Sequence, residues 1–83
     1  MPRWATVAGH GLWFYYHEEH PLPHVAVRGK HRATVRLEDG TILAGSLPTT
    51  VHRAVRRFLA EHREEVFTAW FATQRRERPD SLL

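Results

Sequence analysis

The chain has 83 residues, a formal net charge of +3 and no cysteine, and Lys30 is the only lysine among its twelve basic residues. This length predicts one domain over residues 1–83, and the missing cysteine excludes disulfides and thiolate metal ligands. No run of apolar residues reaches membrane-spanning length and no signal-peptide pattern is present, so we expect a cytoplasmic protein that does not contact a membrane.

Two strand-like segments open the chain, at residues 3–8 and 12–17. Residues 9–11 between them contain two glycines and are typical of a hairpin loop. In the second segment Leu12 and Phe14 alternate with Trp13 and Tyr15, so both faces are largely aromatic. We therefore expect this strand to be central and covered on both sides.

The next segment holds two histidines, His20 and His24, on either side of Pro21 and Pro23. Proline fixes its own backbone and extends the residue before it, so this loop is predicted to be stiff. A stiff loop can hold a proton-transfer group or a ligating group in position before a partner arrives. The segment is therefore a candidate site.

A second hairpin is predicted from residues 25–28 and 32–38 around the loop 29–31. A three-residue loop sets Val27 opposite Ala33 and Val25 opposite Val35, which collects the apolar side chains on one face. A shift of one residue would exchange the faces, so burial selects this register. Its consequence is that His24 and the arginines share the opposite, uncovered face: Arg28, Arg32, Arg36.

The rest of the chain predicts one more strand and two helices. Asp39-Gly40 is a turn signal before a strand at 41–47, and Pro48-Thr49-Thr50 opens a helix that a threonine could cap. Two apolar stripes at helical spacing differ in phase, so we expect a break near His62-Arg63; their members are Val51, Ala54, Val55, Phe58 and Leu59, then Val66, Phe67, Trp70 and Phe71.

The predicted fold is α+β, with segregated elements. Residues 1–47 form a four- or five-stranded antiparallel sheet, residues 48–76 form two carboxy-terminal helices packed on one face, and residues 77–83 fray.

Several of these segments together resemble a bacterial family of unknown function, DUF4160. The matching pieces are the opening Met1-Pro2 with its hairpin, the aromatic strand 12–16, the loop 20–24 and the stretch from Leu47-Pro48 through 62–65 to Trp70. The family loop reads Asp-His-x-Pro-Pro-His-x-His; here Glu19 replaces the aspartate, Pro21 is displaced and Ala26 replaces the third histidine.

The resemblance implies a role as one component of a toxin–antitoxin-like pair, with a cognate antitoxin-like protein as its partner. It implies no reaction, and the assignment to toxin or antitoxin stays open. A homodimer also remains an open alternative.

One hypothesis for the chemistry is acid–base cleavage of RNA. Cleavage needs a base, an acid and a cation for the phosphate. His20 and His24 could act as acid and base, Arg28 as the cation and Tyr15 as a further donor. The alternative is that the alternating Arg, Thr and Glu simply form a solvated strand face. We expect no cofactor, and a metal site at His20 and His24, helped by Glu19 or His17, is a weaker alternative.

The other hypothesis is a non-catalytic binding module for nucleic acid or an acidic partner protein. The first helix carries a basic strip opposite its apolar stripe, formed by His52, Arg53, Arg56 and Arg57. Such a strip attracts phosphates in a salt-dependent manner, although it can also serve only solubility. We expect nucleic-acid contacts from this strip and from the strand face, that is from Arg28, Arg32, Arg36, Arg53, Arg56 and Arg57.

Overall fold

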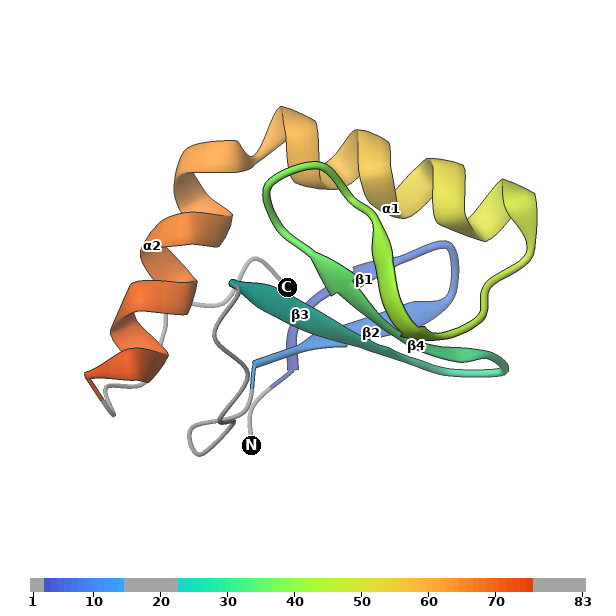
Figure 1. Ribbon diagram of the computed structural model, residues 1–83, viewed down its shortest axis with the longest axis horizontal. Helices are drawn as coiled ribbons and strands as arrows, with labels where there is room; N and C mark the ends of the chain where they lie inside the picture. Colours follow the sequence, from blue (N-terminus) through green and yellow to red (C-terminus); the bar gives the residue numbers. More distant parts are fainter. Residues whose placement is uncertain (1–2, 15–22, 76–83) are drawn as a thin grey trace.

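An antiparallel sheet is the framework of the protein, with two helices following it in the chain (Figure 1). The computed structural model describes residues 3–14 and 23–75. Within them, five strands lie in the order β1-β2-β3-β4-β5, each antiparallel to its neighbour: β1 Arg3–Val7, β2 His10–Trp13, β3 His24–Arg28, β4 Arg32–Arg36 and β5 Ile42–Gly45. The helices are α1 Thr49–Glu61 and α2 Arg63–Gln74. The predicted α+β fold is confirmed.

The first hairpin is tighter than the sequence predicted. Val7 pairs with His10, and the two residues between them have positive φ angles, 49° at Ala8 and 74° at Gly9. Two successive positive φ angles are typical of a type I′ turn, whose twist suits a two-residue hairpin loop. The predicted loop at 9–11 is therefore wrong, because His10 and Gly11 already belong to β2.

The predicted register of the second hairpin is confirmed. Val25 pairs with Val35 and Val27 with Ala33, and the pair Arg28–Arg32 closes a three-residue loop. All four of the apolar residues are buried in the core. Since side chains alternate along a strand, His24 and the three arginines project from the other face of β3 and β4.

The core lies between the sheet and α1, which runs along one face of the sheet in Figure 1. Val55 and Leu59 of α1 are buried with the valines of β3 and β4, and each such side chain contributes roughly 1.5–3 kcal/mol on burial. Pro48 occupies the N-cap position and no side chain caps the helix, so the expected threonine cap does not form. The amphipathic stripe of α1 is confirmed.

The predicted break between the helices is confirmed at His62, whose backbone angles are φ −116° and ψ 35°. After it, α2 turns away from α1 and passes the end of the sheet where β3 begins (Figure 1). This direction buries Val66 and Trp70 but leaves Phe71 52% exposed, so the second predicted stripe is wrong at that residue. Among the described helices, none is long and apolar enough to cross a membrane.

Candidate functional site

Three arginines of β3 and β4, here called the sheet arginines, are brought together as the sequence predicted: Arg28, Arg32 and Arg36. Arg32 is exposed, whereas Arg28 and Arg36 are half-buried. The register also sets His24 beside Arg36. The strand pairing therefore creates the expected basic row.

One sheet arginine is already engaged by a carboxylate. Arg36 Nε donates to Asp39 Oδ1 at 3.0 Å, and a second bond joins Arg36 to the other carboxylate oxygen. The backbone N–H of Thr41 also donates to Asp39 Oδ1, at 2.9 Å. These hydrogen bonds, with Arg36 contributing most, hold the pKa of Asp39 well below its ordinary value, and the same pair raises the pKa of Arg36.

The expected exposure of His24 is wrong. Its side chain is 5% exposed, and its ring lies 5.0 Å from the ring of Trp70, centroid to centroid. The sequence placed His24 on the uncovered face because it did not predict that α2 turns past the start of β3. In this position the imidazole contributes to packing, and solvent reaches it only slightly.

Two of the four proposed catalytic residues, His20 and Tyr15, lie outside the described residues. The other two, His24 and Arg28, lie at opposite ends of β3, roughly 13 Å apart at about 3.3 Å per residue, so they do not form a compact catalytic pair. Within residues 3–14 and 23–75, no group of three potential metal ligands is close enough to hold an ion.

A second basic region lies on α1. Its three predicted arginines, here called the helix arginines, are all exposed: Arg53, Arg56 and Arg57. Arg57 lies 3.6 Å from Glu61 in a solvent-exposed pair, a contact that contributes about 1 kcal/mol or less. Within the described part of the chain, Arg53 and Arg56 have no carboxylate partner, so their guanidinium groups are available to a ligand.

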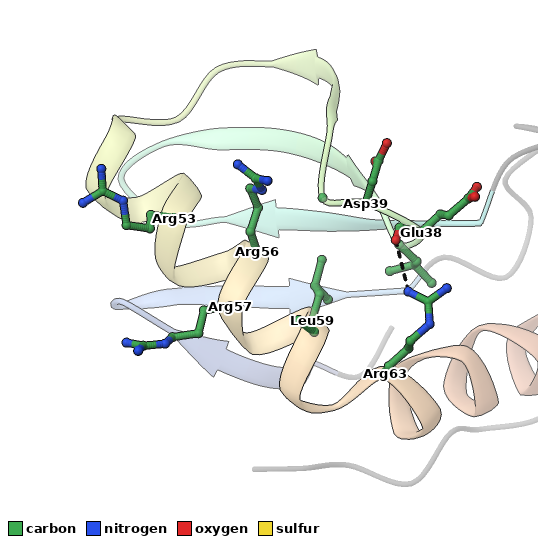
Figure 2. A pocket seen from close by; sticks show the side chains of 10 residues that line it. Glu38, Asp39, Arg53, Arg56, Arg57, Leu59 and Arg63 are labelled. Atoms are coloured by element: carbon green, nitrogen blue, oxygen red, sulfur yellow. Dashed lines mark hydrogen bonds between the residues drawn. The ribbon is translucent and has the colours of Figure 1, made fainter.

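The helix arginines line a cleft between α1 and the turn that joins β4 to β5 (Figure 2). Its volume is about 330 Å³, at the lower end of the roughly 300–1,000 Å³ of small-ligand sites. The lining combines basic, acidic and apolar side chains with one glycine: Leu37, Glu38, Asp39, Gly40, Arg53, Arg56, Arg57, Leu59, Ala60 and Arg63. Four arginines thus line one small cleft, although Figure 2 shows the guanidinium groups of Arg53 and Arg57 pointing away from the turn and that of Arg63 directed at Glu38.

The wall formed by the β4–β5 turn is held in place by contacts to α1. His52 Nε2 lies 2.7 Å from the carbonyl oxygen of Gly40. Gly40 has φ +75°, and a Cβ added there would lie 2.5 Å from Arg56 Cγ. The glycine therefore allows both the turn and the close approach of the Arg56 side chain.

Sequence reasoning did not include Arg63 in the site. This residue begins α2, and its Nη1 donates to the carbonyl oxygen of Glu38 at 3.1 Å, as the dashed line in Figure 2 shows. Its guanidinium carbon also lies 5.1 Å from the centre of the Phe67 ring. Because the helix breaks at His62, between Arg56 and Arg63, helical spacing could not have placed Arg63 at this cleft.

Comparison with known proteins identifies the family. The model of the family described as "Domain of unknown function (DUF4160)" matches residues 9–71. The chain belongs to this family. The match includes both arginine sets and the cleft, but the family description names no activity. Neither the curated proteins nor the solved structures gave a significant match.

Proposed function

We propose that this protein is a nucleic-acid-binding component of a toxin–antitoxin-like pair, and that it binds phosphates through the cleft beside α1. The observation that carries the proposal is that four arginines line one cleft, of which Arg53 and Arg56 have no carboxylate partner among the described residues. Guanidinium groups bind phosphate through a planar pair of donors, and several together favour a polyanion.

The test is the affinity for a labelled RNA mixture, containing single strands and hairpins, as salt is raised. The double variant Arg53→Gln/Arg56→Gln should weaken binding at least about 100-fold, because two charge-assisted hydrogen bonds are lost and each is worth roughly 1.5–3 kcal/mol. It should also reduce the slope of log affinity against log salt by about two.

The matched control is Arg3→Gln/Arg32→Gln, which removes the same charge from two exposed positions on the sheet. Its affinity should stay within about threefold of the original protein, as expected for charges outside the contact. Absence of RNA binding by the unaltered protein, or equal losses in the two double variants, would contradict the proposal.

The pairing with a second protein rests on what the family resemblance implies. Its test is co-expression with the product of the neighbouring gene. We expect a complex that survives size-exclusion chromatography, and we expect the partner to relieve any growth arrest that this protein causes alone. If the two proteins elute separately and neither affects growth, the paired role is wrong.

A second candidate function is RNA cleavage, but the structure weakens it, because His24 is 5% exposed and packs against Trp70 while the neighbouring Arg36 is hydrogen-bonded to Asp39. Its proposed residues are His20 and His24 as acid and base, Arg28 for the phosphate and Tyr15 as a donor. Purified protein should then cleave RNA, and His20→Ala should abolish cleavage. RNA that stays intact at both acidic and neutral pH would rule the reaction out.

A further inference from the structure

We propose that the cleft accommodates one unstacked nucleotide of a single strand, with its phosphates on α1 and its base against the apolar part of the lining. This inference rests on the proposed function and specifies its ligand. It starts from the unequal charge of the two walls. The α1 wall carries Arg53, Arg56 and Arg57, whereas the turn supplies Glu38 and Asp39 and is reached by Arg63 of α2 (Figure 2).

The two walls give the ligand an orientation. A phosphate beside the helix arginines gains charge-assisted hydrogen bonds, while a phosphate beside the turn meets the Glu38 carboxylate and the Asp39 carboxylate, whose charge Arg36 partly offsets. The carboxylate of Asp39 stays ionised because Arg36 and Thr41 hydrogen-bond to it. The sugar-phosphate chain is therefore expected along α1 only, and the uncharged part of the nucleotide extends toward the turn.

The lining between the walls suits a flat, weakly polar group. Its accessible part is formed by Ala60 and the aliphatic stems of the arginines, above Leu37 and Leu59, which are buried at its base. Guanidinium groups also stack on planar rings, so the same side chains can contact both a phosphate and a base. A volume of about 330 Å³ accommodates a ligand of nucleotide size, but not a stretch of duplex.

A duplex fits this arrangement poorly for two reasons. Its bases are stacked and paired, so none can enter the cleft without being unpaired, which costs a few kcal/mol. Its second phosphate chain would also approach the acidic wall. The chemistry favours single-stranded RNA or DNA, since no observed contact selects for the ribose hydroxyl.

The experiment compares three labelled oligonucleotides of equal length: a single strand, the same sequence as a duplex, and a single strand of abasic sites. The single strand should bind at least tenfold more tightly than the abasic strand, the loss expected when a stacked base is removed. It should also bind at least tenfold more tightly than the duplex. The single strand should be tested as both RNA and DNA, and we expect similar affinities.

The possible outcomes distinguish failure of the nucleotide pocket from failure of the proposed nucleic-acid binding. Equal affinity for the abasic strand, or tighter binding of the duplex, would overturn the nucleotide pocket while keeping a phosphate-binding surface. Displacement of the single strand by an acidic peptide at equal charge concentration would overturn it in favour of a protein ligand. If none of the oligonucleotides binds, the proposed function itself fails.

A pair of variants at Ala60 locates the site. Ala60 is exposed and lines the cleft, so Ala60→Glu adds a negative charge there and Ala60→Gln adds the same bulk without charge. The glutamate variant should bind the single strand at least tenfold more weakly, and the glutamine variant should stay within about threefold. Thermal unfolding of both variants checks that the fold is kept. Equal affinities in the two variants would place the binding elsewhere and overturn the inference.

Discussion

The sheet arginines and the helix arginines are the same residue type in equal number, but their surroundings differ. On the sheet, Arg36 is hydrogen-bonded to Asp39 and Arg28 is half-buried, so that Arg32 alone of the three is exposed. On α1 all three arginines are exposed, and they border a cleft. The comparison teaches that a basic residue is available to a ligand only where no carboxylate or packed side chain of the protein already engages it.

The largest expected effect concerns the sheet region and is a loss of stability. His24→Ala removes a side chain that is 5% exposed and contacts Trp70, so the variant should lose roughly 2 kcal/mol of unfolding free energy from the cavity that remains. Urea denaturation measures this change. RNA affinity of the folded variant should stay the same.

The control for this comparison is Arg53→Gln/Arg56→Gln, which should lose RNA affinity but keep its stability. Both residues are exposed, so unfolding free energy should change by less than about 0.5 kcal/mol while RNA affinity falls. A stable His24→Ala variant that has lost RNA binding or cleavage would instead make the sheet face the functional surface.

A smaller effect is expected at the acidic wall of the cleft. Glu38→Gln removes one of the two carboxylates that repel a phosphate chain, so affinity for single-stranded RNA should rise about two- to threefold, the range for one exposed charge. Titration of labelled RNA at low salt measures it. Glu64→Gln removes an exposed charge from α2 outside the cleft lining and should have less effect. A weaker interaction in Glu38→Gln would mean that this wall attracts the ligand.

The smallest effect concerns the Arg36–Asp39 pair and its dependence on pH. The folded protein holds the pKa of Asp39 below its ordinary value of 3.8, because Arg36 and Thr41 hydrogen-bond to the ionised carboxylate. The pair's contribution is therefore complete above the unfolded pKa and is lost as pH falls below it. Both side chains are partly exposed, so the contribution is small.

Asp39→Asn tests this pair, since the asparagine oxygen can still accept from Thr41. Urea denaturation at pH 5 and pH 3 should show a slightly greater loss of stability in the unaltered protein than in the variant. The variant also releases Arg36 from its carboxylate. If its RNA affinity rises as much as that of Glu38→Gln, the sheet arginines take part in binding and the contrast between the two regions is weaker than we propose.

Much of the fold could be predicted because the alternation and helical spacing of apolar residues pointed to the same faces that burial in a core requires. The register of β3 and β4 followed from placing Val25, Val27 and Val35 on one face, and the helix break at His62 followed from the change of phase between two apolar stripes. The first hairpin was predicted less well. Its turn places Ala8 at a positive φ, a conformation that alanine rarely adopts. The prediction therefore placed the turn at residues 9–11, where the two glycines are.

The candidate site was predicted only in part. The helix arginines were named from their spacing, and the family resemblance was confirmed by the match to residues 9–71. The sequence did not indicate that Glu38, Asp39 and Gly40 would form the opposite wall, or that Arg63 would reach the Glu38 carbonyl. These contacts join residues far apart in the chain, and periodic patterns in a sequence predict only local structure.

The sequence alone determined the order of the elements, the faces that β3, β4 and α1 turn toward the core, and the excess of arginine. These follow from side-chain alternation, helical spacing and composition, which are local properties of the chain. Only the tertiary structure decided which charged groups are free. The direction of α2 buried His24, and the packing of α1 beside the β4–β5 turn created the cleft, because burial and charge pairing depend on neighbours that folding brings together.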